Sequence, residues 1–136
     1  MNILFVCKHN VFRSRIAESY FKKINKNPKF KAKSAGLIKG SINNKAQLNA
    51  FKELKIKPAS KPKNISIKLL KKQDLIIIVA DDLPSVVFDN KSYVKKLVKW
   101  NIPDVLYNDR EKAKKSILLI KNKVNELLKD LENGNY

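Results

Sequence analysis

The fold of this chain is decided by residues 1–14, which read Met1-Asn2-Ile3-Leu4-Phe5-Val6-Cys7-Lys8-His9-Asn10-Val11-Phe12-Arg13-Ser14. The apolar run that ends at Val6 is typical of a parallel strand that is buried on both faces. From Arg13 to about Asn25, apolar residues recur at helical spacing and predict a helix. The residues from Cys7 to Ser14 therefore connect a buried strand to a helix.

This connection has the features of an anion-binding loop built around a nucleophilic sulfur. Backbone N–H groups converge at the start of a helix, where the dipole is positive, and they favour a thiolate at Cys7. The spacing to Arg13 lets the loop curl into a nest of N–H groups that a two-pronged guanidinium closes. Ser14 is placed to donate to the Cys7 sulfur, and Asn10 to bridge loop backbone groups. The residues expected to contact the anion are Lys8, His9, Asn10, Val11, Phe12 and Ser14.

A structural interpretation competes with the chemical one. Cys7 can be a small buried hydrophobe and Arg13 an ordinary residue at the start of a helix. The position after an apolar strand, with Ser14 beside Arg13, favours the chemical interpretation. For His9, an outward-facing surface side chain is favoured over a loop acid or base. For Trp100, two interpretations remain open, a wall of the substrate site or a core residue.

Strands and helices are predicted to alternate along the rest of the chain. Further strands are expected at 30–33, closed by a turn at 34–36, at 74–80 and at 93–100. Helices are expected at 46–54 with Asn43 or Asn44 as the cap, at 65–71, briefly after Asp81-Asp82-Leu83-Pro84, and at 111–131. This alternation predicts an α/β fold with a parallel sheet, whose sites lie at the carboxyl ends of the strands. The length fits a single domain, 1–136.

Asp104 is the candidate proton donor. It follows the last predicted strand and Ile102-Pro103, so it lies on a carboxyl-end loop. The alternative is that Asp104 caps a turn or the next helix. Asp109 is the competing carboxylate, but it lies next to the long helix and is interpreted as its N-cap. Asp81 and Asp82 have no His partner nearby and are interpreted as loop or capping residues, so no metal is expected.

The composition limits the classes of partner. A net charge of +18 is typical of nucleic-acid binders, but Arg occurs only at 13, 15 and 110, and no zinc spacing or RNA-binding aromatic motif is present. Nucleic acid is therefore a less favoured partner than an anionic substrate steered by the charge. The longest apolar run, 75–80, is far shorter than the ~20 residues of a membrane span. One cysteine and no recognisable leader predict a cytoplasmic protein without disulfides.

The stretch Leu4-Phe5-Val6-Cys7-Lys8-His9-Asn10-Val11-Phe12-Arg13-Ser14-Arg15-Ile16-Ala17-Glu18-Ser19 resembles the low-molecular-weight protein tyrosine phosphatases and their relatives, the cysteine-loop arsenate reductases. The likeness continues through Ser34-Ala35-Gly36, the strand at 74–81 and Ile102-Pro103-Asp104. It implies a three-layer α/β sandwich with a four-stranded parallel sheet in the order 2-1-3-4, flanked by helices. It also implies that Cys7 attacks phosphorus, Arg13 binds the oxyanion and Asp104 protonates the leaving group, without a cofactor.

The cysteine count separates the two reactions of these relatives. A reductase that resolves its nucleophile internally needs two further cysteines, and this sequence has only Cys7. Arsenate reduction would therefore need an external thiol or a redoxin. Phosphomonoester hydrolysis is the favoured function, on a phosphorylated protein or a small phosphate- or arsenate-like anion. External-thiol arsenate reduction is the first alternative, and a non-catalytic binder of an anion, phosphoprotein or nucleic acid is the second. Specificity is expected around Asn43 and Asn44 and after Asp104.

Overall fold

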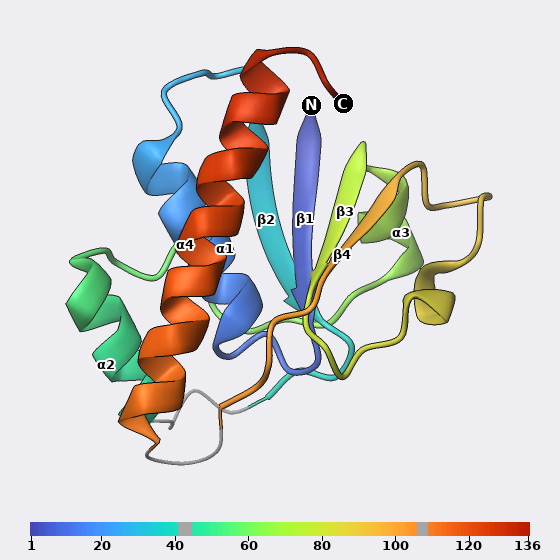
Figure 1. Cartoon of the computed structure of the whole chain (residues 1–136). Helices are drawn as coiled ribbons and strands as arrows, with labels where there is room; N and C mark the ends of the chain where they lie inside the picture. The colour runs from blue at the N-terminus through green and yellow to red at the C-terminus, as the bar shows by residue number, and fades with distance from the viewer. Residues whose placement is uncertain (41–44, 106–108) are drawn as a thin grey trace.

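A computed structural model describes residues 1–40, 45–105 and 109–136, and the side chains of these residues except 45–47. Its centre is a sheet of four parallel strands, β1 (Asn2–Cys7), β2 (Lys31–Gly36), β3 (Leu75–Val79) and β4 (Leu97–Trp100). The strands lie in the order β2-β1-β3-β4 (Figure 1). The predicted fold class and strand order are therefore confirmed.

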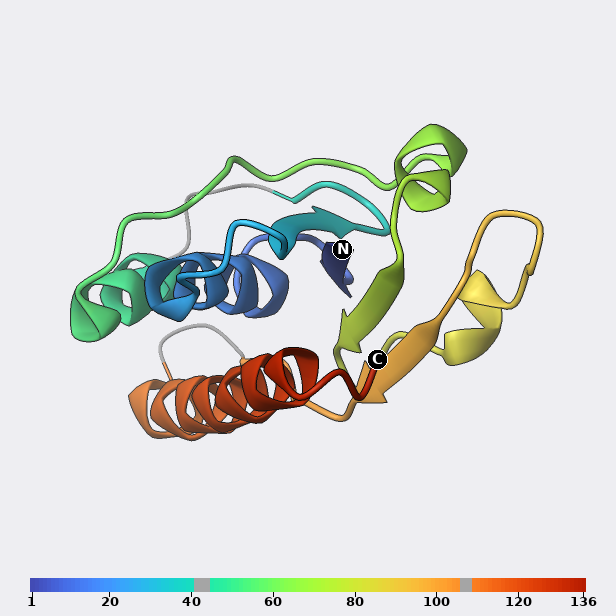
Figure 2. The same cartoon turned by 90° about the horizontal axis from the view of Figure 1, so that it is seen from above.

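Helices cover both faces of the sheet. The helices α1 (Arg13–Ile24), α2 (Lys45–Leu54) and α4 (Arg110–Glu132) lie on one side, and α3 (Ile67–Lys71) and the 3-10 helix η1 (Ser85–Phe88) lie on the other (Figures 1 and 2). The result is three layers, with the sheet in the middle. Within the described residues, no helix is long and apolar enough to cross a membrane.

The protein has two hydrophobic cores, one on each face of the sheet. Both receive residues from the same strands, because successive side chains of a strand point to opposite faces. Ile3 and Phe5 of β1 join the core under α1, α2 and α4, whereas Leu4 and Val6 join the core under α3 and η1. Strand β3 divides in the same way, and all five of its residues are buried. This burial on both faces explains why its sequence, Leu75–Val79, is apolar without alternation.

The strand register brings the carboxyl ends of all four strands to one edge. Cys7 is the last residue of β1 and pairs with Gly36, the last residue of β2. Val79, at the end of β3, pairs with Trp100 at the end of β4. The loops that leave these four positions therefore gather at this edge, as the lower end of the sheet in Figure 1 shows.

The structure corrects two predicted boundaries. The last strand begins at Leu97 rather than at 93, because residues 91–93 form a turn and Val94 is buried in the second core. Residues 34–36 belong to β2 and are not a turn. The amide of Gly36 donates to Lys63 O (2.8 Å) and its carbonyl accepts from Ile65 N (2.9 Å), so distant backbone extends the strand.

The structure also shows the roles of Trp100 and Asp109. Trp100 is 6% exposed and its ring centroid lies 5.8 Å from that of Phe5, so it is a core residue. Asp109 caps α4 and accepts from Lys112 N at 3.1 Å, as predicted. The proposed caps Asn43 and Asn44 lie outside the described residues.

Candidate active site

The loop from Cys7 to Arg13 curls at the amino end of α1. Asn10 has φ 55°, a left-handed conformation that Asn tolerates better than most residues. The helix begins at Arg13, its N-cap Phe12 offers no side-chain acceptor, and its first turn contains no acidic residue. The amide groups at this helix end therefore face the loop without a competing carboxylate of their own turn, as an anion site requires.

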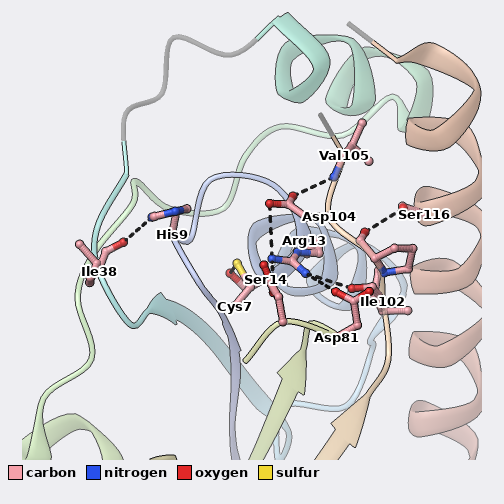
Figure 3. A network of polar contacts seen from close by, with 12 residues as sticks. Cys7, His9, Arg13, Ser14, Ile38, Asp81, Ile102, Asp104, Val105 and Ser116 are labelled. Carbon is pink, nitrogen blue, oxygen red and sulfur yellow. Dashed lines mark hydrogen bonds and ion pairs between the residues drawn. The ribbon is translucent and has the colours of Figure 1, made fainter. Parts of the chain in front are cut away.

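The floor of the loop is a chain of polar side chains. Ser14 Oγ lies 2.9 Å from Cys7 Sγ, and both residues are buried. Asn10 Nδ2 donates to Ser14 Oγ at 2.7 Å and to Ser34 Oγ at 2.9 Å. Asn10 Oδ1 accepts from Lys63 N at 3.0 Å. The side chain of Asn10 thus ties the loop to α1, to β2 and to the segment before α3, and Figure 3 shows Ser14 beside the sulfur.

The segment 36–40 supports the outside of the loop through backbone hydrogen bonds. Three of its amides donate to successive loop carbonyls, namely Leu37 N to Cys7 O (3.1 Å), Ile38 N to Lys8 O (3.0 Å) and Gly40 N to His9 O (2.9 Å). This ladder continues the pairing of β1 with β2 beyond the end of the sheet. The carbonyl groups of Cys7, Lys8 and His9 therefore accept hydrogen bonds on the outer side of the loop.

Glycine is required where this segment touches the loop. A Cβ on Gly36 would lie 2.7 Å from the carbonyl carbon of His9 and 2.8 Å from the amide nitrogen of Asn10, which are both backbone atoms. The His9 side chain is exposed, and its Nδ1 lies 3.1 Å from Ile38 O (Figure 3). His9 therefore holds the outer segment and faces solvent, in line with the favoured surface interpretation.

Arg13 is almost fully buried, with 2% of its side chain exposed, and three carboxylates surround its guanidinium. Nη2 lies 2.9 Å from Asp82 Oδ1 and 3.7 Å from Asp104 Oδ2. Nη1 lies 3.6 Å from Asp81 Oδ1 and donates to Ile102 O at 3.0 Å. Figure 3 shows Asp81 and Asp104 on opposite sides of the guanidinium. The loops after β3 and β4 therefore orient the arginine.

Asp81 and Asp82 are the acidic residues that sequence reasoning missed as part of the site. They lie on the loop after β3, as the sequence predicts, and both also face Arg13. The available signal was topological, because β3 neighbours β1 in the predicted order and its carboxyl end must lie beside the loop. The Asp81 amide also donates to Ile102 O at 3.0 Å, which joins the two acidic loops.

Asp104 lies on the loop after β4 with half of its side chain exposed. Its Oδ1 accepts from the following amide, Val105 N, at 2.9 Å, and its other oxygen faces Arg13. Ser116 of α4 donates to Pro103 O at 3.1 Å and anchors the loop (Figure 3). One carboxylate oxygen therefore stays directed toward the anion site.

The remaining loop residues divide between solvent and core. Lys8 is exposed and Val11 is half-buried, so both can form part of the rim. The sequence predicts Phe12 at the substrate, but its side chain is 6% exposed and packs into the core under α1, α2 and α4. Burial of this apolar side chain removes its surface from water, which is favourable in free energy. Only the backbone of Phe12 is therefore available to an anion.

Arg15 is a further site-supporting residue that the sequence did not single out. Its Nη1 donates to Val11 O at 3.2 Å, its Nε donates to Ser60 O at 3.0 Å, and its guanidinium lies 5.2 Å from the ring centroid of Phe51. Burial lowers the pKa of Arg15 from its ordinary value, and the charge of Glu18 acts in the opposite direction. Arg15 thus holds the Val11 carbonyl of the loop by a hydrogen bond.

Comparison with known proteins places this site in a family. Residues 2–135 match the family described as low molecular weight phosphotyrosine protein phosphatase. The chain belongs to this family. No curated protein sequence matches it.

Solved structures of family-like proteins share the fold. A low-molecular-weight protein tyrosine phosphatase from T. tengcongensis is 25% identical, with a TM-score of 0.78 over 96% of this chain and 99% of that chain. An arsenate reductase from Archaeoglobus fulgidus is 28% identical, with a TM-score of 0.73 over 93% and 98%. An arginine phosphatase from Geobacillus stearothermophilus is 19% identical, with a TM-score of 0.83 over 98% and 94%, which shows the fold alone.

The described part of this low-molecular-weight phosphatase chain contains no group of three or more His, Cys, Asp or Glu side chains that would hold a metal ion. The three carboxylates at the site are turned toward the guanidinium of Arg13 instead. The site brings together a sulfur, a guanidinium, carboxyl groups and backbone amides.

Proposed function

We propose that this chain hydrolyses phosphate monoesters through a cysteinyl-phosphate intermediate, with residues 1–136 acting as one phosphatase domain. The observation that carries the proposal is the combination of Cys7 Sγ, 2.9 Å from Ser14 Oγ inside the loop, with the Arg13 guanidinium 3.7 Å from Asp104. A nucleophile, an oxyanion binder and a proton donor thus come from one edge of the sheet. Membership of the phosphatase family supports the same chemistry.

The reaction proceeds in two steps. The Cys7 thiolate attacks phosphorus, the ester P–O bond breaks, and Asp104 donates its proton to the leaving oxygen. Water then attacks the phosphorus while the Asp104 carboxylate accepts a proton, and the P–S bond breaks to release phosphate and the thiolate. Arg13 and the loop amides stabilise the charge on the equatorial oxygens in both transition states.

The substrate is proposed to be a phosphorylated protein or a small phosphate- or arsenate-like anion. The net charge of +18 attracts such anions from a distance, an effect that salt screens. The proposed compartment is the cytoplasm, where a lone thiol stays reduced.

The decisive experiment compares turnover of an aryl phosphate by the wild type and by Cys7→Ser, with vanadate as competitor. We expect the wild type to release phosphate, vanadate to inhibit it, and Cys7→Ser to be inactive because a hydroxyl is a much weaker nucleophile. A panel with phosphotyrosine, phosphoserine and phosphoarginine peptides then identifies the substrate class. A wild type without turnover on any of these substrates would contradict the proposal.

The role of Asp104 has a matched control in Asp109. Asp104→Asn removes the proton donor, so we expect kcat for an aryl phosphate to fall on the order of 10²-fold or more. Asp109→Asn makes the same change of charge five residues away, and Asn is also a good helix N-cap. We expect Asp109→Asn to keep wild-type turnover. Equal activity of both variants would remove Asp104 from the mechanism.

Arsenate reduction is the second candidate function, and the arsenate reductase from Archaeoglobus fulgidus at 28% identity favours it. The Cys7 thiolate would displace water from arsenate and form an As–S bond. Because these 136 residues have no second cysteine, an external thiol would attack the Cys7 sulfur and release arsenite, and a second thiol would reduce the resulting mixed disulfide. Arsenite formation measured with and without added glutathione or a glutaredoxin tests it. Phosphatase turnover without any arsenite formation would exclude it.

A further inference from the structure

The positive charge of this protein is concentrated in one part of the chain. Residues 19–73 contain sixteen lysines, no arginine and one acidic residue, Glu53. This stretch therefore has a net charge of +15, out of the total of +18. It includes the second half of α1 and all of β2, α2 and α3. Such an asymmetry in charge marks a surface that attracts an anionic partner.

A groove lies within this region, between the end of α1 and the start of β2. Its volume is about 570 Å³, within the range of roughly 300–1,000 Å³ that is usual for ligand sites. Phe21, Phe30 and Ala32 give the groove an apolar base, and Phe21 and Ala32 belong to the core. Its rim contains exposed lysines from both elements, namely Lys22, Lys26, Lys31 and Lys33.

A second groove adjoins the first one, between α1 and the segment that follows α2. Its volume is about 440 Å³, and Ile56 and Pro58 are among the apolar residues that line it. Its lysines are Lys22, Lys23, Lys55 and Lys57. Because Lys22 lines both grooves, they form one continuous surface. We call the two grooves with their lysines 22, 23, 26, 31, 33, 55 and 57 the lysine track.

The wall of the first groove is held in place by the turn that connects α1 to β2. Asn25 Nδ2 donates to the carbonyl oxygens of Asn27 and Phe30, both at 3.0 Å. Asn25 Oδ1 accepts from Asn27 N, also at 3.0 Å. These hydrogen bonds fix the backbone on one side of the groove. A partner therefore meets a preformed surface, which lowers the entropy cost of binding.

The charges of the lysine track have little compensation inside the protein. Among the residues that the structure describes, Lys22 is the only lysine of the track in an ion pair, with Glu18 at 2.8 Å. Like charges that are close together repel one another, so an anion that binds between them relieves this repulsion. The track is therefore complementary to a partner with several negative charges.

The first groove is also separate from the catalytic edge of the sheet. Lys31, at its rim, pairs with Asn2 at the start of β1, whereas Cys7 pairs with Gly36 at the other end of the same two strands (Figure 1). A partner in this groove therefore leaves the loop from Cys7 to Arg13 free.

We propose that the lysine track is a docking site for an acidic segment of a partner protein. Carboxylates of the segment contact the lysines at the rim, and apolar side chains between them fill the base of the grooves. Nucleic acid fits this surface less well. None of the described residues that line the grooves is an arginine, and the ring of Phe21 is fully buried and cannot stack on a base. Docking does not depend on phosphatase turnover.

The test is fluorescence anisotropy with a labelled peptide in which a phenylalanine and a leucine stand among glutamates. We expect saturable binding to the wild type that weakens as the salt concentration rises. A matched peptide with glutamine in place of every glutamate keeps the apolar anchors but loses the charge, so it should bind roughly tenfold more weakly or less tightly still. A wild type that binds neither peptide at low salt, or both equally, would overturn the proposal.

Charge reversal at the rim locates the site. Lys26→Glu combined with Lys31→Glu should weaken binding of the acidic peptide by roughly tenfold. Lys91→Glu combined with Lys114→Glu changes the net charge by the same amount at exposed positions outside the track. This control should bind the peptide like the wild type. Equal weakening in both double variants would attribute binding to net charge alone and overturn the proposal.

The second groove has its own pair of substitutions. Lys55→Glu combined with Lys57→Glu should weaken binding by a similar factor, because an extended segment contacts both grooves. Lys22 is left unchanged in all variants, since it is the partner of the buried Glu18 carboxylate. Wild-type binding by this second pair of substitutions would contradict docking along the whole track.

Two competitors separate the proposal from other modes of binding. A labelled oligouridine RNA should bind more weakly than the acidic peptide, and tighter binding of the RNA to the same lysines would replace the proposal by a nucleic-acid site. Vanadate, which competes for the anion loop, should not displace the peptide. Displacement by vanadate would place the peptide at the loop and overturn the proposal. A wild type that hydrolyses no phosphate ester would remove the proposed function without changing any of these binding results.

Discussion

Arg13 and Asp82 form the closest ion pair at the site, with 2.9 Å between Nη2 and Oδ1. The guanidinium is buried, whereas the Asp82 side chain is 36% exposed. The charge of Asp81 adds to the negative potential around the same guanidinium. An entering oxyanion must therefore bind an arginine that already has carboxylate partners, and these carboxylates repel it.

Asp82→Asn should bind vanadate more tightly than the wild type. The change removes one negative charge near the oxyanion, while Asn Oδ1 still accepts from Arg13 Nη2. Because Asp82 is partly exposed, solvent screens the repulsion, and we expect a gain of about threefold to tenfold. Isothermal titration calorimetry with vanadate at low and high salt measures it, and the gain should shrink at high salt.

Asp89→Asn is the control for this prediction, because it makes the same change of charge at an exposed position after η1. It should leave vanadate affinity unchanged. Weaker binding by Asp82→Asn would show that orientation of Arg13 matters more than repulsion of the anion.

At the scale of elements, the active-site loop depends on the end of β2. Gly36 pairs with Cys7 in the sheet and is in contact with the backbone of His9 and Asn10. The hydrogen bonds from residues 37, 38 and 40 to the loop carbonyls begin at this glycine. The curvature of the loop therefore depends on two segments that are distant in sequence, the loop itself and residues 36–40.

Gly36→Ala should distort the loop and destabilise the protein. The new Cβ would lie 2.7 Å from a backbone carbon, and backbone cannot move aside as a flexible side chain can. We expect a loss of about 1–3 kcal/mol in the free energy of unfolding and of roughly 10²-fold in kcat/KM. Urea unfolding and aryl phosphate kinetics measure the two effects.

Lys33→Ala changes an exposed residue of the same strand and serves as the control. It should keep both stability and activity. A Gly36→Ala variant with wild-type kinetics would show that the loop tolerates a shift of its outer support.

At the scale of the whole molecule, the start of the sheet is held by a carboxylate opposite the active site. Asp74 Oδ2 accepts from Asn2 N at 2.7 Å, and Lys95 Nζ lies 3.5 Å from Oδ1. The backbone N–H of Asn2 is the main cause that lowers the pKa of Asp74 below its ordinary value, and Lys95 acts in the same direction. Asp74 thus joins the starts of β1, β3 and β4.

Asp74→Ala should destabilise the protein at neutral pH but not in acid. A pKa that is lower in the folded than in the unfolded state stabilises the fold above the unfolded value of about 3.9. The stabilisation is lost as the pH falls through the lower folded value. Because 40% of the side chain is exposed, we expect less than about 1 kcal/mol at pH 7.

Urea unfolding of Asp74→Ala and wild type between pH 7 and pH 2 measures this difference, with Asp89→Ala as the exposed control. The stability difference between wild type and Asp74→Ala should narrow in acid. A difference that stays constant with pH would mean that the carboxylate contributes through packing and not through its charge.

Local patterns in the sequence accounted for most of the fold and for the centre of the site. Apolar runs without alternation identified β1 and β3, because strands buried on both faces have no polar side. Helical spacing identified α1 and α4. The buried residues of α4 lie on one face, whereas residues 13–19 of α1 are buried all round the helix. The spacing of Cys7 and Arg13 between a strand and a helix identified the loop, because anion sites form where helix amides converge.

Only the tertiary structure decided which distant side chains join that loop. Asp81, Asp82 and Ile102 reach Arg13 from the ends of β3 and β4, and Ser34 of β2 accepts from Asn10 of the loop. The side chain of Phe12 lies in the core under α1, α2 and α4 rather than at the anion, which spacing along the chain does not reveal. Periodicity and spacing along the chain determine each helix and strand and the place of the nucleophile. Strand order and register determine which loops meet at the site. Order and register depend on contacts between residues far apart in sequence, so local patterns do not contain them.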